Sequence, residues 1–171
     1  MKVLVGYASG YGSTKSYADV IGEELRRSGH ETDVLPAKKA MNLAAYAFVV
    51  VGGSIRAGRW LGPAVKLARK AVKAGKRHAV FFCCLAARTE EGRKKVFGDY
   101  LDKVKEKVPG LAPLEIGAFP GMANYAEYRF PIRGIMTGIA KKEGVDCSVN
   151  QDYREPEAAR EWTRELVRRL G

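Results

Sequence analysis

Residues 9–14 carry the residue types and the spacing that bind a phosphate group. Hydroxyl side chains alternate there with glycines and one aromatic residue: Ser9, Gly10, Tyr11, Gly12, Ser13 and Thr14. Glycine lets backbone N–H groups approach a ligand closely, and hydroxyl groups donate further hydrogen bonds. The six residues follow the apolar run 3–5, a predicted buried strand, and lead into a helical pattern. Because the amino terminus of a helix favours negative charge, the sequence predicts a phosphate-binding turn at this point.

Other phosphate-binding patterns fit the sequence less well. The string Gly-x-x-x-x-Gly-Lys-Ser/Thr of a P-loop is absent. A dinucleotide-binding fingerprint needs a third glycine where Lys15 stands, and an acidic residue near 34–36, which reads Val-Leu-Pro. A response-regulator receiver needs an acidic cluster after the first strand, and the sequence has none there. A plain glycine turn that only joins strand to helix remains the alternative.

Strand and helix patterns alternate along the chain, and they must position this turn. Strands are predicted over 3–5, 31–35, 47–52, 79–83 and 114–118, and helices over 13–28, over 63–73, from 89 and from 156. The alternation predicts one α/β domain over 1–171, a three-layer sandwich around a five-stranded parallel sheet. Right-handed crossovers give the strand order 2-1-3-4-5, in which a ligand binds at the carboxyl ends of the strands.

The spacing Ser9-x-x-Gly12-x-Thr14-x-x-x-Ala18 resembles the FMN-phosphate loop of flavodoxins, with Tyr7 at a position that is usually aromatic in that family. The resemblance implies a flavodoxin-like fold with FMN as cofactor. Loops 54–60 and 85–89 are expected at the same edge of the sheet. Their residues would flank the flavin: Ser54, Ile55, Arg56, Ala57 and Gly58 from the first, and Leu85, Ala86, Ala87 and Arg88 from the second.

Trp60 or Ile55 could cover the flavin ring, and Arg56 or Arg59 could stabilise its reduced form or bind an acidic substrate. The alternative is a mobile loop in which Trp60 only caps the next helix. The loop after the fourth strand lacks the tyrosine that many flavodoxins stack on the ring. That absence favours a flavin open to a reactant.

Three strings resemble a particular branch of the family, the menaquinone-dependent protoporphyrinogen oxidases. They are Gly53-Ser54-Ile55-Arg56-x-Gly58, Leu85-x-Ala87-Arg88 and Tyr125-x-x-Tyr128-Arg129-Phe130. The resemblance implies a step of heme biosynthesis, in which FMN oxidises a porphyrinogen and passes the electrons to a quinone. Arg59, Trp60, Tyr125 and Arg129 are the expected substrate contacts.

Two other functions stay open: a flavodoxin-type electron carrier for redox partner proteins, and a scaffold that has lost FMN. The sequence shows no nucleophile–base pair and no cluster with metal-ligand spacing, so we predict neither catalytic side chains nor a metal site. The cofactor itself would carry the redox chemistry.

The charge balance points to anionic partners. Thirty basic and 19 acidic residues give a net charge of +11. After the fifth strand, Ile132, Ile135, Met136, Ile139 and Ala140 form an apolar stripe. On another face, spaced every four positions, lie Arg129, Arg133, Thr137 and Lys141, with Lys142 beside them. Such a helix suits contact with an anionic membrane or with the acidic groups of a substrate. A helix that covers the sheet and keeps a solvated basic face is the alternative.

The location expected from the sequence is the cytoplasm, with peripheral contact at the inner membrane face. No signal-like segment and no membrane-spanning apolar stretch occur, and the three cysteines have no pairing pattern. We expect no nucleic-acid partner.

Overall fold

The fold is an α/β sandwich built on a parallel sheet. The computed structural model describes residues 1–40, 42–142 and 144–171. Five parallel strands lie in the order β2-β1-β3-β5-β6, which confirms the predicted order 2-1-3-4-5. The five strands are β1 (Lys2–Ala8), β2 (Glu31–Pro36), β3 (Phe48–Arg56), β5 (Arg77–Cys83) and β6 (Ile116–Phe119).

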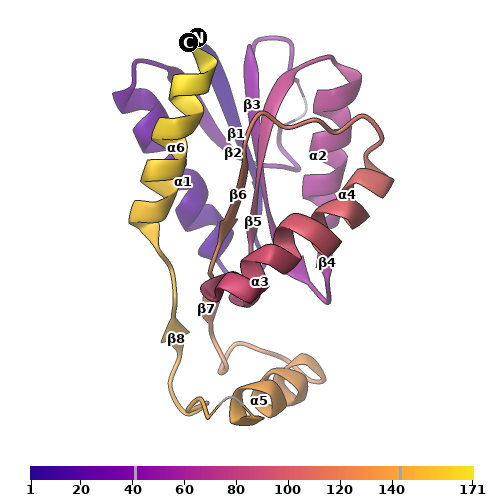
Figure 1. The fold of residues 1–171 in the computed structure, drawn as a ribbon, viewed down its shortest axis with the longest axis vertical. Coiled ribbons are helices and arrows are strands. Elements are labelled where there is room, and N and C mark those ends of the chain that lie inside the picture. Colours follow the sequence, from indigo (N-terminus) through magenta and orange to yellow (C-terminus); the bar gives the residue numbers. More distant parts are fainter. Residues whose placement is uncertain (41, 143) are drawn as a thin grey trace.

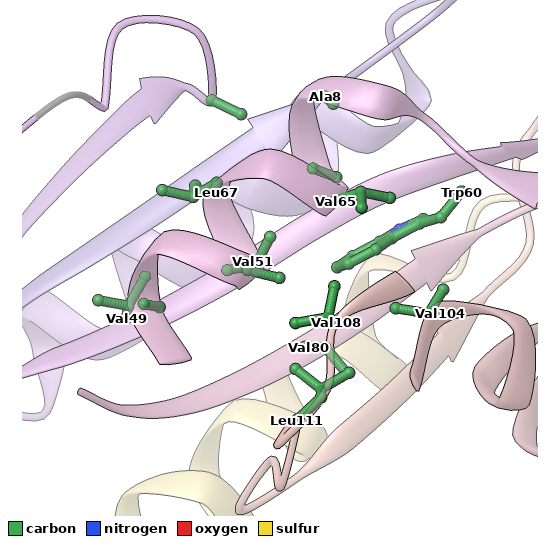
Figure 2. Packing of buried hydrophobic residues seen from close by; sticks show 14 of the residues in the cluster. Ala8, Val49, Val51, Trp60, Val65, Leu67, Val80, Val104, Val108 and Leu111 are labelled. Carbon is green, nitrogen blue, oxygen red and sulfur yellow. The ribbon is translucent and has the colours of Figure 1, made fainter. Parts of the chain in front are cut away.

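Helices cover both faces of this sheet (Figure 1). On one face lie α1 (Ser13–Arg27) and α6 (Pro156–Leu170), and on the other lie α2 (Gly62–Lys73) and α4 (Leu101–Lys107). Figure 2 shows the second of these layers, where buried side chains of β3 and β5 meet those of the two helices: Val49, Val51, Val80, Val65, Leu67 and Val104. The central strands are apolar on both sides because both sides are covered.

The loop predicted over 54–60 is a β-hairpin. β3 continues to Arg56 and pairs antiparallel with β4 (Arg59–Trp60). The turn residues Ala57 and Gly58 have φ values of 46° and 69°. A two-residue turn of this left-handed kind matches the twist of the two strands. The fifth parallel strand also differs slightly, since it begins and ends later than the predicted 114–118.

The single helix predicted after Thr89 is divided in two. The Thr89 hydroxyl accepts a first-turn N–H, as an N-cap should. α3 (Glu90–Lys95) then passes through one π-helical turn, Val96–Tyr100, into α4. Within this turn Val96 is buried, whereas Phe97 is 44% exposed.

Residues 122–152 form what we call the edge segment, which lies beyond the carboxyl edge of the sheet (Figure 1). Its two ends pair antiparallel as β7 (Met122–Ala123) and β8 (Gln151–Asp152), and α5 (Ile132–Lys142) lies between them. α5 does not cover the sheet, so that alternative is wrong. The apolar stripe shows that the helix has an apolar face, but not what that face packs on.

Candidate functional site

The turn over 9–14 and the β3–β4 hairpin meet at the carboxyl edge of the sheet. The parallel register of β1 on β3 brings the ends of the two strands together. Thr14 is 0% exposed, and its Oγ1 lies 2.6 Å from Oγ of Ser54. Within the turn, the N–H of Gly12 donates to Oγ of Ser9 over 3.0 Å. Two of the three predicted loops therefore form one site.

The start of α1 has the backbone of an anion-binding turn. Gly12 has a φ of 95°, in the left-handed region that favours glycine. No side chain among the described residues caps the first turn of α1, and that turn contains no acidic residue. Its N–H groups have no intrahelical acceptor, and the helix dipole adds partial positive charge there. The residues present therefore fit a phosphate group.

Arg56 brings a full positive charge to the same turn. Its guanidinium lies 4.8 Å from the ring centroid of Tyr11. A Cβ atom built on Gly10 would collide with that guanidinium, so the arginine packs directly on the backbone of the turn. Arg56 is exposed and makes no ion pair with any described residue. The guanidinium could therefore interact with an anion bound at this turn.

The third predicted loop is the 3₁₀ turn Leu85–Arg88, which follows β5. The N–H of Cys84 donates to the Phe119 carbonyl over 3.1 Å, which ties this loop to the end of β6. Ala87 is fully buried and Ala86 is half-buried. The Arg88 guanidinium lies 5.4 Å from the Tyr153 ring, which belongs to the chain just after the edge segment.

An aromatic cluster joins the edge segment to two of these loops. Tyr128 packs edge-to-face on Tyr11 with ring centroids 5.0 Å apart, and on Tyr125 at 6.0 Å. Leu85 packs against the same cluster. Burial raises the pKa of the Tyr128 hydroxyl above its ordinary value. Tyr125, a predicted substrate contact, thus lies in a buried cluster beside the site.

Two side chains of α1 fasten the ends of the edge segment. Ser13 Oγ accepts the N–H of Met122 over 3.0 Å. The Tyr17 hydroxyl donates to the Pro120 carbonyl over 2.6 Å and accepts the N–H of Glu155 over 2.8 Å. The sequence does not reveal this role of Tyr17, because an aromatic residue at a helical core position gives no sign of a polar contact. The same stretch of α1 therefore serves both the turn and the edge segment.

The structure does not bring Trp60 to the turn. Trp60 is 4% exposed and packs on Phe82 with ring centroids 5.0 Å apart, in the layer of Figure 2. Ile55 packs against that same layer. Arg59 is exposed on the hairpin, and Arg129 is exposed in the edge segment, where it lines a groove along α5. In the described ranges, no three His, Cys, Asp or Glu side chains gather to hold a metal ion.

Comparison with known proteins gives one family and several similar structures. Residues 4–149 match the family model of the flavodoxin domain. The structure resembles a short-chain flavodoxin associated with a non-canonical PDU bacterial microcompartment (TM-score 0.61, 13% identity, 100% of this chain and 99% of that one). It also resembles oxidised flavodoxin 1 from Bacillus cereus (TM-score 0.50, 21% identity, 70% of this chain and 84% of that one).

A third similar structure is a flavoprotein in complex with FMN from Lactobacillus acidophilus NCFM (TM-score 0.52, 15% identity, 68% of this chain and 92% of that one). At these identities the likeness establishes the fold alone. No curated protein sequence matches the chain significantly.

Proposed function

Because the chain belongs to the flavodoxin domain family, we propose that it binds FMN at the carboxyl edge of the sheet and transfers electrons through it. The observation that carries this proposal is the hydroxyl pair of buried Thr14 and half-buried Ser54, 2.6 Å apart. This pair joins the phosphate-type turn to the hairpin that would flank a flavin. The uncapped first turn of α1 and the left-handed Gly12 support the same proposal.

FMN, when bound, supplies a ring that takes up electrons from one molecule and gives them to another. The residues of this chain would bind and orient it. Ser9, Thr14 and the first-turn N–H groups of α1 would hold the phosphate, with the Arg56 guanidinium beside them. The hairpin at 54–58 and the turn Leu85–Arg88 would flank the ring.

A second candidate is oxidation of an anionic small molecule such as a porphyrinogen, with a quinone or a redox protein as electron acceptor. The edge segment favours it, because this segment places Tyr125 and Tyr128 against the turn and the third loop. Arg129 and Arg133 line a groove of the same segment and would meet acidic groups of a substrate, as Arg59 would from the hairpin. The third loop also has no tyrosine to shield the ring.

Mass spectrometry of the small molecule released from freshly purified protein tests the cofactor. FMN is the expected species. Release of a different cofactor, or an apoprotein to which added FMN does not bind, would contradict the proposal.

An anaerobic assay separates the two candidates once FMN is bound. A carrier accepts electrons from a reductase and passes them to a partner protein, and does not oxidise a porphyrinogen. The second candidate oxidises a porphyrinogen in multiple turnovers when a quinone is supplied. The apoprotein is the control in both assays.

A further inference from the structure

The edge segment exposes a row of large apolar side chains. Ile132, Ile135 and Ile139 of α5 are 39%, 59% and 47% exposed, and Phe130, just before the helix, is 92% exposed. Within the described part of α5, only Ala140 is buried. Exposed apolar side chains on successive turns of one helix mark a surface that is covered by a partner.

Cations accompany this row. Arg129, Arg133 and Lys141 line a groove of about 660 Å³ along α5, and Lys142 is exposed at its end. None of the four forms an ion pair with a described residue.

Two aspartates of the edge segment are engaged by residues outside α5. Asp152 is held by Arg154 over 2.7 Å, and Asp146 accepts hydrogen bonds from Ser148. These bonds hold the pKa of both carboxyl groups below the ordinary value. Among the described residues no carboxylate pairs with the cations of α5, so these cations are available to an outside anion.

We propose that α5 docks on the surface of an anionic lipid bilayer, with its isoleucines and Phe130 at the acyl boundary and its cations near the headgroups. An amphipathic basic helix binds such a surface through apolar burial together with attraction to anionic lipid. A second copy of the chain fits less well, because two unpaired basic surfaces would repel each other. The contact is peripheral for the part of the chain that the structure describes, where every helix is too short or too polar to span a bilayer.

Docking through α5 would fix how the protein is oriented relative to the bilayer. α5 lies beyond the carboxyl edge of the sheet, away from the helices that cover its faces (Figure 1). That edge, with the turn over 9–14, would then face the bilayer. The inference does not depend on FMN binding, because it rests only on the surface of the edge segment.

Co-sedimentation of the full chain with lipid vesicles tests this inference. We expect binding to vesicles that contain about one-third phosphatidylglycerol, and binding at least tenfold weaker to pure phosphatidylcholine. The double variant Arg133→Gln/Lys141→Gln should bind the anionic vesicles roughly thirtyfold more weakly, at about fivefold per charge near the surface. The matched control Lys66→Gln/Lys105→Gln removes the same charge from exposed sites on other helices and should bind within about twofold of wild type.

The apolar part is tested separately. Ile135→Ser should weaken binding roughly tenfold. Phe97→Ser is the control, because Phe97 is exposed to a similar degree but lies outside the edge segment. Circular dichroism and the melting temperature check that each variant is folded.

Three results would overturn the inference. The first is no binding to anionic vesicles, and the second is an equal loss of binding in the control variants. The third is a wild-type dimer in sedimentation velocity that Ile135→Ser converts to monomer, which would show that a second copy covers this face.

Discussion

Thr14 is the residue on which the proposed cofactor site depends most. It is fully buried, and its hydroxyl can serve a phosphate only while it keeps its place beside Ser54. Thr14→Ala removes one hydrogen bond to a charged group, worth about 1.5–3 kcal/mol, so the Kd for FMN should rise roughly 10- to 150-fold. Titration followed by flavin fluorescence measures this change.

Ser16→Ala is the matched control for Thr14→Ala. The Ser16 hydroxyl donates to the Ser13 carbonyl within the helix over 2.8 Å, and so does not depend on a ligand. Equal FMN affinity in wild type and Thr14→Ala would show that the Thr14 hydroxyl does not contribute to FMN binding.

Arg56 should recognise the phosphate and not the ring, because its guanidinium packs on the turn at Gly10 and Tyr11. Arg56→Gln should weaken FMN binding about tenfold and leave riboflavin binding unchanged, since riboflavin has no phosphate. Calorimetric titration with both ligands gives the comparison. Arg168→Gln on α6, which removes an exposed charge far from the turn, is the control. An equal loss of affinity for FMN and riboflavin would show that Arg56 contacts the flavin ring and not the phosphate.

Ionisation of Cys83 should lower the stability of the fold at alkaline pH. Burial raises the pKa of its thiol from 9.0 to about 12 in the folded chain. Between these values the unfolded thiol loses its proton and the folded thiol keeps it, so raising the pH favours the unfolded state. The free energy of unfolding should fall by about 1.4 kcal/mol per pH unit from this group.

Urea unfolding between pH 7 and pH 10.5 measures this dependence. In Cys83→Ala the free energy of unfolding should fall less steeply above pH 9. The loss of packing caused by the substitution lowers this free energy by the same amount at every pH, so it does not change the slope. Burial also raises the pKa of Tyr17, so some dependence above pH 10 should remain in the variant. Identical slopes in the two proteins would contradict the assignment to Cys83.

At the scale of elements, α1 links the turn over 9–14 to the edge segment through Tyr17. Its hydroxyl bridges Pro120 and Glu155, which flank the two ends of that segment. Tyr17→Phe should lower the free energy of unfolding by about 1–3 kcal/mol, because it leaves buried backbone groups without a partner. Hydrogen exchange near β7 and β8 should accelerate.

Tyr46→Phe is the control for this prediction. Its hydroxyl donates to a carboxylate oxygen of Asp33, and its ring lies beside Lys2 at the start of β1, at the amino ends of the strands and away from the edge segment. Faster exchange near β7 and β8 in both variants would show a general loss of stability and not a local one.

The elements that the sequence predicted correctly are those with a local signal. Apolar runs bounded by turn residues located the parallel strands, and their alternation with helices gave the strand order. The turn between β1 and α1 was also predictable, because its signal lies in six consecutive residues; phosphate binding there stays a prediction. In contrast, the packing of Tyr128 on Tyr11 joins residues far apart in the sequence, and no local pattern reports such a contact.

Trp60 illustrates the same limit at the site. A tryptophan after a strand can cover a ligand or fill the core, and the sequence allows both. In the structure Trp60 fills the core, because the hairpin directs its indole onto Phe82. The exposed row on α5 is the opposite case, where a pattern typical of core packing lies at the surface.

At the scale of the whole molecule, the edge of the sheet that holds the turn is also the edge that carries the edge segment (Figure 1). The net charge of +11 attracts anionic molecules and surfaces to the protein as a whole, while the cations of α5 lie next to an apolar row. A cofactor at this edge would thus lie between the folded body and the proposed bilayer contact.

The most direct test of this account is calorimetric titration of FMN into the apoprotein. We expect saturable binding of one FMN per chain, with quenched flavin fluorescence, and clearly weaker binding of riboflavin, which lacks the phosphate. No heat of binding and no change in fluorescence at high FMN concentration would contradict it.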